Sequence, residues 1–105
     1  MIAVSATDGG ITLEGHAGYA QAGKDIVCAG VTALVQTLIV SLEELTADQI
    51  EYSISPGKAD ICYRNLSEAG RLLVGSFFVG LKEIEREFPE YIRLSCPQQI
   101  GRAHV

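Results

Sequence analysis

The 105-residue sequence is poor in the residues on which several protein classes depend. It has three cysteines, an odd number, and no basic run leading into an apolar secretion signal, so a disulfide-stabilised secreted scaffold is not indicated. Its 8 lysines and arginines are outnumbered by 13 aspartates and glutamates, and the net charge of −5 argues against direct nucleic-acid binding. Apolar runs are broken by polar residues well short of about 18, so no membrane partner is expected. We therefore expect a protein of the cytoplasm, with a charge that suits a basic partner.

Metal and cofactor sites are also not indicated. The ligand types present are His16, Cys28, Cys62, Cys96 and His104, and no two of them form a close-spaced pair of the C-x-x-C or H-x-x-x-H kind. We expect Cys62 to alternate with buried strand residues, and Cys96 and His104 to lie near the end of the chain. No metal and no cofactor are predicted.

What is present is enough for one globular domain over residues 1–105. Apolar residues make up 48% of the chain and charged residues 20%. Alternating apolar and polar residues predict strands, and apolar residues spaced by three and four predict helices. The expected strands are 2–5, 11–15, 49–55, 60–64 and 91–96, the expected helices are 26–45 and 67–88, and 97–105 is expected to be a frayed tail. The order ββαββαβ predicts an α+β fold, with two helices packed on a mostly antiparallel sheet.

One stretch combines the residue types of a thiol active site. His16 is expected where the second strand ends, and a helix is expected from Ile26 with Asp25 as its N-cap. Cys28 then falls in the first helical turn, where the helix dipole favours the reactive thiolate and free N–H groups can hold an oxyanion. Local geometry can bring His16 within hydrogen-bond reach of this cysteine. We predict a Cys–His pair.

The loop between the two residues contains Gly18 and Gly23. These glycines allow backbone angles that other residues avoid, and we interpret the segment as a substrate-gating loop, an ordinary connector being the alternative. Residues 18–25 also fit the phosphate-binding spacing G-x-x-x-x-G-K. Asp25 stands where that loop needs serine or threonine to bind magnesium, so nucleotide binding is not favoured.

The segments His16-Ala17-Gly18 and Gly23-Lys24-Asp25-Ile26-Val27-Cys28-Ala29 resemble the signature of the bacterial ribosomal-processing cysteine proteases called Prp. The resemblance extends along nearly the whole chain, in length and in the order of strands and helices. It implies that His16 and Cys28 are the catalytic pair. Asp25 matches the family's aspartate, with capping the helix and orienting His16 as its alternative roles. The family pattern has serine at the position of Thr32, which keeps the hydroxyl and adds a methyl.

The resemblance implies a function as well. Prp proteases remove a short N-terminal extension from the twenty-seventh protein of the large ribosomal subunit, so the expected partner is the precursor of that protein. Family members are similar in forming homodimers, and the helix expected at 26–45 is apolar on more than one side, which fits an interface. The residues by themselves leave a hydrolase, a redox protein and a noncatalytic interaction domain open. Beside the protease, the alternatives are therefore a noncatalytic dimeric ribosome-associated adaptor and a thiol redox sensor.

Overall fold

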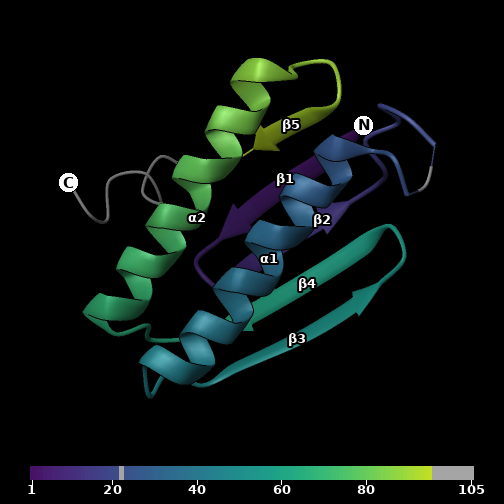
Figure 1. Cartoon of the computed structure of the whole chain (residues 1–105). Coiled ribbons are helices and arrows are strands. Elements are labelled where there is room, and N and C mark those ends of the chain that lie inside the picture. The colour runs from purple at the N-terminus through teal and green to yellow at the C-terminus, as the bar shows by residue number, and fades with distance from the viewer. Residues whose placement is uncertain (22, 96–105) are drawn as a thin grey trace.

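The computed structural model describes residues 1–21 and 23–95, and it contains five strands and two helices (Figure 1). The expected order ββαββαβ is confirmed, whereas the tail predicted at 97–105 lies outside the described residues. The elements are β1 (Ile2–Thr7), β2 (Gly10–Glu14), α1 (Ile26–Leu45), β3 (Ile50–Ser55), β4 (Lys58–Tyr63), α2 (Glu68–Glu87) and β5 (Ile92–Ser95).

The five strands form one sheet in the order β3-β4-β2-β1-β5. Three of the four pairings are antiparallel and only β1 with β5 is parallel, which confirms a mostly antiparallel sheet. The two hairpins meet through β2 and β4, where Glu14 pairs with Lys58. This register places the β3–β4 turn beside the end of β2, where the candidate histidine follows.

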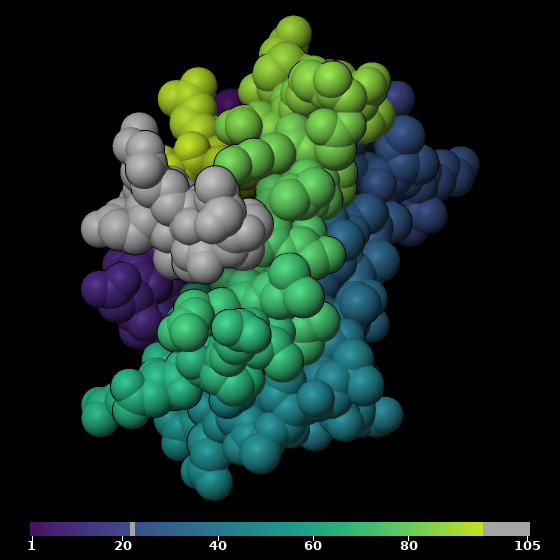
Figure 2. All heavy atoms as spheres, turned by 90° about the vertical axis from the view of Figure 1, so that its left-hand side faces the viewer, coloured from purple at the N-terminus to yellow at the C-terminus, as the bar shows by residue number. Residues whose placement is uncertain are grey.

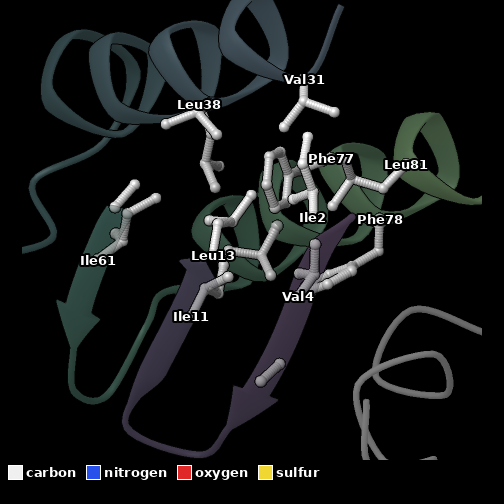
Figure 3. Packing of buried hydrophobic residues seen from close by; sticks show 14 of the residues in the cluster. Ile2, Val4, Ile11, Leu13, Val31, Leu38, Ile61, Phe77, Phe78 and Leu81 are labelled. Carbon is white, nitrogen blue, oxygen red and sulfur yellow. The ribbon is translucent and has the colours of Figure 1, made fainter. Parts of the chain in front are cut away.

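Both helices cover the same face of the sheet, and the core lies between the two layers (Figures 1 and 3). Strand alternation supplies it from one side: Ile2 and Val4 of β1 are buried while Ala3 and Ser5 are exposed. Figure 3 shows the side chains of β1, β2 and β4 pointing toward α1 and α2. The largest fully buried side chains are Ile11, Leu42, Ile61, Leu81, Ile92, Val4 and Val27.

Helix α1 lies on the sheet and against α2. Gly80 lets the two helices approach closely, since a Cβ there would lie 3.0 Å from Leu34, whereas a Cβ on Gly30 would meet Ile84 at an ordinary contact distance of 3.4 Å. By length and composition α1 could cross a membrane, a test that an apolar core helix also passes. Its buried residues are Val27, Val31, Val35, Leu38, Ile39 and Leu42.

The start of α2 is held by hydrogen bonds that involve Ser67 and the carboxylate of Asp48. Ser67 caps the helix by accepting a hydrogen bond from the Gly70 N–H, and Asp48 accepts bonds from both the backbone N–H and the hydroxyl of Ser67. The Ser67 hydroxyl is the main cause of a lowered pKa of the Asp48 carboxyl. These bonds connect the segment after α1 to the first turn of α2.

Candidate active site

The site begins at Asp25, which is confirmed as the N-cap of α1. Its Oδ1 accepts a hydrogen bond from the Cys28 N–H at 2.9 Å. Its Oδ2 accepts from the backbone N–H groups of Tyr19 at 2.9 Å and Ala20 at 3.3 Å. Of the two roles considered for Asp25, capping is the one with hydrogen bonds in the structure. The same carboxylate also holds the loop that precedes the helix.

These hydrogen bonds lower the pKa of the Asp25 carboxyl below its ordinary value. The N–H of Cys28 is the largest cause, desolvation opposes it, and the N–H groups of Ala20, Tyr19 and Val27 add to the lowering. Donors aimed at a carboxylate favour its charged form. Asp25 is therefore ionised at neutral pH.

Cys28 lies in the first turn of α1, as predicted, and its side chain is half-buried. Its Sγ atom accepts a hydrogen bond from the backbone N–H of Ala17 at 3.3 Å. Ala17 is buried and directly follows His16 in the sequence. The loop therefore brings a backbone donor to the sulfur.

His16 is exposed and lies between the start of β1 and the β3–β4 turn. The Met1 nitrogen donates to its carbonyl oxygen at 2.6 Å, and the N–H of Gly15 donates to the Gly57 carbonyl at 2.8 Å. A Cβ built on Gly57 would lie 2.9 Å from Nε2 of the imidazole, so the ring rests where that glycine has no side chain. Gly57 has a φ of 75°, which favours glycine at this turn.

Two hollows meet at the candidate pair. One, of about 280 Å³, lies between α1 and the β3–β4 turn, and the other, of about 800 Å³, lies between α1 and the loop. Four residues line both: His16, Cys28, Thr32 and Gln36. Within the described residues no hydrogen bond joins the imidazole to Sγ, as is common in sites without substrate. We refer to these two adjoining hollows, one toward the β3–β4 turn and one toward the loop, together as the groove.

The other predicted residues also line this groove. Thr32 is exposed one turn after Cys28, and its place in both hollows puts it at the middle of the groove. Gly18 and Gly23 line the hollow on the loop side, with φ values of 74° and 86°. A Cβ on either glycine would meet nothing within 4 Å, so backbone conformation alone favours glycine there.

An aromatic contact holds the loop against the far end of α2. The ring of Tyr19 packs edge-on against Phe88 at 5.5 Å and Tyr91 at 5.2 Å between centroids. Figure 2 shows the same proximity, with the blue segment after β2 beside the yellow-green end of α2. The segment between Gly18 and Gly23 is therefore anchored in this structure at Tyr19.

Of the remaining ligand-type residues, the structure describes Cys62, which does not line either hollow. Cys62 is exposed and alternates with buried Ile61 and Tyr63, as predicted for a strand residue on the other face of the sheet. Among residues 1–21 and 23–95, no group of three or more histidine, cysteine, aspartate or glutamate side chains is placed to hold a metal. Cys96 and His104 lie outside the described residues.

The model of the family described as cysteine protease Prp matches residues 1–93, which is most of the chain. The chain belongs to the Prp cysteine protease family. The resemblance read from the motif around His16 and Cys28 is thereby confirmed, and the family is one of ribosomal processing enzymes.

Individual Prp proteins agree with this assignment. The ribosomal processing cysteine protease Prp of Staphylococcus aureus is 29% identical over 88 residues, covering 81% of this chain and 83% of the relative. The Bacillus subtilis Prp is 27% identical over 90 residues, covering 79% and 80%. The crystal structure of S. aureus Prp with a covalently linked product peptide superposes with a TM-score of 0.83 at 25% identity, covering 91% of this chain and 97% of that one.

Two features of this Prp site are missing from the sequence prediction. The β3–β4 turn lines the groove and its Gly57 packs on His16, but the Pro56-Gly57-Lys58 segment indicates only a turn, not its neighbour. The Ala17 N–H is a backbone group, and no residue type signals it. The oxyanion donors expected at the helix start stay a prediction, and one of these groups, the N–H of Cys28, donates to Asp25 in this structure.

Proposed function

We propose that this chain is the endopeptidase that removes the N-terminal extension of the twenty-seventh protein of the large ribosomal subunit, with Cys28 as nucleophile and His16 as its proton partner. One observation carries the proposal: both side chains line two adjoining hollows, one toward the β3–β4 turn and one toward the loop. An endopeptidase needs room for the substrate chain on each side of the cleaved bond. A redox-active thiol or an adaptor surface has no such requirement.

The chemistry proceeds in two stages. His16 accepts the thiol proton of Cys28, and Sγ attacks the scissile carbonyl to form a C–S bond and an oxyanion. When the C–N bond breaks, the imidazolium of His16 gives its proton to the leaving amine. His16 then takes a proton from water, whose oxygen attacks the thioester. Cleavage of the C–S bond releases the carboxylic acid product, and the imidazolium of His16 returns its proton to the sulfur to regenerate the thiol.

The loop between Gly18 and Gly23 has the position of a substrate gate. Its described residues line the larger hollow, and they contact the body of the protein through the Tyr19 ring and through the hydrogen bonds that Tyr19 and Ala20 donate to Asp25. Glycines at both ends permit the backbone to change conformation. We infer that substrate enters by displacing this segment.

Partner and location follow from the same proposal. A net charge of −5 favours encounter with a basic ribosomal protein and not with nucleic acid, and a role in processing that protein implies an enzyme of the cytoplasm.

The exposed apolar side chains of α1, including Ile26 and Val40, support a homodimer. Sedimentation of the native chain and of an Ile26→Glu, Val40→Glu variant tests this: the native chain should sediment as a dimer and the variant as a monomer. A native monomer would refute the dimer.

The decisive experiment is cleavage of a peptide copied from the N-terminal extension of the host's ribosomal protein. Native protein is compared with Cys28→Ala and His16→Ala, and Cys62→Ala serves as the matched control because that thiol lies on the other face of the sheet. Mass spectrometry locates the cut, and circular dichroism confirms that each variant is folded. We expect one cut by the native and Cys62→Ala proteins, and no detectable cut by the other two.

The alternatives give different results. A native protein that never cuts, but whose Cys28 is oxidised by peroxide much faster than Cys62, would support the thiol sensor. Absence of cutting with equally slow alkylation of both thiols would support the adaptor. Equal cutting by Cys28→Ala would refute the proposed nucleophile.

A further inference from the structure

The N–H of Cys28 at the start of α1 is not free to hold an oxyanion. It donates to Asp25 Oδ1, and the N–H of Ala29 donates to the Asp25 carbonyl. Freeing the Cys28 N–H would cost the hydrogen bond that caps the helix. A donor outside the helix cap can hold the negative charge on an attacked carbonyl without that cost.

The Ala17 N–H is placed to be that donor. It points at Sγ over 3.3 Å, and the oxyanion forms within two bond lengths of this sulfur. Its peptide group is held from the opposite side, because the His16 carbonyl of the same planar group accepts a hydrogen bond from the Met1 nitrogen at 2.6 Å. Ala17 itself is buried. The orientation of the donor is thus fixed before substrate arrives, as transition-state stabilisation requires.

We propose that the backbone N–H of Ala17 is the oxyanion donor of this enzyme, in the place that the first turn of α1 was expected to fill. The inference rests on Cys28 being the nucleophile of the proposed function. In the resting site the N–H donates to the sulfur. When Sγ bonds to the carbonyl carbon, the charge moves from sulfur to oxygen, and the same N–H follows it.

The test removes this one N–H and leaves the side chains unchanged. Cys28 allows full-length semisynthesis, because a synthetic 1–27 thioester can be ligated to a recombinant 28–105 fragment that begins with this cysteine. The 1–27 segment carries lactic acid in place of Ala17, so an ester replaces the amide. A matched chain carries the ester at Ala20, whose N–H donates over the same 3.3 Å but to Asp25 Oδ2.

Two reagents distinguish an effect on the oxyanion from an effect on the reactivity of the Cys28 sulfur, because only one of the two reactions forms an oxyanion. Attack of the Cys28 thiolate on p-nitrophenyl acetate forms a C–S bond and an oxyanion, then breaks the C–O bond to release p-nitrophenolate. Attack on iodoacetamide forms a C–S bond and expels iodide without any oxyanion. Peptide-resolved mass spectrometry follows alkylation at Cys28, and subtraction of the Cys28→Ala rate gives its share of the acylation.

We expect the ester at Ala17 to slow acylation by about 10²-fold or more, which is typical for loss of one oxyanion donor. Alkylation should change by less than about threefold, and the ester at Ala20 should leave the ratio of the two rates unchanged. Equal slowing of both reactions would show that the N–H only stabilises or positions the sulfur, and no slowing of acylation would overturn the proposal.

A measurement on the native chain needs no variant. Binding of N-acetylglycinal, a minimal peptide aldehyde, places an oxygen on the carbon attached to Sγ. The proposal predicts a downfield shift of the Ala17 amide proton and slower exchange with solvent, and an unchanged resonance with Cys28 modified would contradict it. Neither assay uses the ribosomal peptide, so failure of the natural substrate to be cut would refute the proposed function and leave this test intact.

Discussion

Removing the ring of Tyr19 should loosen the loop over the groove by an amount that the structure allows us to estimate. The ring makes two edge-on contacts, with Phe88 and Tyr91, and it is 41% exposed. Such pairs contribute about 0.5–1.5 kcal/mol each, and we take the lower end for a partly exposed ring. Loss of about 1 kcal/mol corresponds to a roughly fivefold increase in the open population.

Trypsin provides the assay, because Lys24 lies in this loop. Cleavage of a locally opening segment follows its open population when opening and closing are fast relative to cleavage. Tyr19→Ala should therefore be cut after Lys24 about five times faster than the native chain, with the same fragments. Hydrogen exchange at the Tyr19 and Ala20 amides, which donate to Asp25, should accelerate by the same factor.

Two controls make the estimate refutable. Tyr19→Phe keeps both ring contacts and should be cut at the native rate. Tyr52→Ala removes another half-exposed tyrosine, on β3, and should also leave the rate unchanged. If Tyr19→Ala is cut no faster than these controls, the aromatic contacts do not hold the loop and the Asp25 hydrogen bonds are sufficient.

Three further outcomes follow. Asp25→Ser keeps a good helix cap but offers no second oxygen to the loop. We therefore expect an unfolding midpoint close to that of the native chain and faster trypsin cleavage after Lys24. A large fall in the unfolding midpoint that accompanies the faster cleavage would contradict separate capping and loop roles. Gly57→Ala puts a Cβ 2.9 Å from Nε2 of His16 at a φ of 75°, so acylation by p-nitrophenyl acetate should slow by about 10-fold or more, and an unchanged rate would show that the ring is free to move. Asp25 and Asp48 have lowered pKa values, so the stability they provide is present above their ordinary pKa of 3.8 and is lost as pH falls through the lower folded values. Urea unfolding of an Asp25→Asn, Asp48→Asn variant should show a flatter pH dependence between about pH 2 and 5, and an unchanged slope would assign the acid sensitivity elsewhere.

The sequence predicted each element because local patterns decide it. The helix expected at 26–45 has those bounds, and its cap at Asp25 is present. The helix expected at 67–88 is observed at Glu68–Glu87, with Ser67 as its cap. Pairing between strands was beyond prediction, because alternation shows which side chains face the core but not which strand lies alongside. The β2–β4 and β1–β5 pairings join segments that are far apart in the sequence.

The candidate site likewise combines features set by local sequence patterns with features set by the pairing of distant segments. His16 and Cys28 were predicted because a strand end and a helix start are local features, and both line one groove. The Gly57 contact depends on the β2–β4 pairing, which brings the turn next to the imidazole. The Ala17 N–H depends on the path of the loop, and every residue except proline has such a group. The side chains of the candidate site were visible in the sequence, and the backbone groups that contact them were not.

The described loop residues before Gly18 and those after it contact different parts of the protein. Before it, His16 is fixed at its carbonyl by Met1, and Ala17 is buried with its N–H on the sulfur. After it, Tyr19 is held by Asp25 and by rings at the surface. A backbone change at Gly18, whose φ is 74°, can therefore release Tyr19 and leave the contacts of His16 and Ala17 in place. The substrate gate that we propose would then open onto a site that is already assembled.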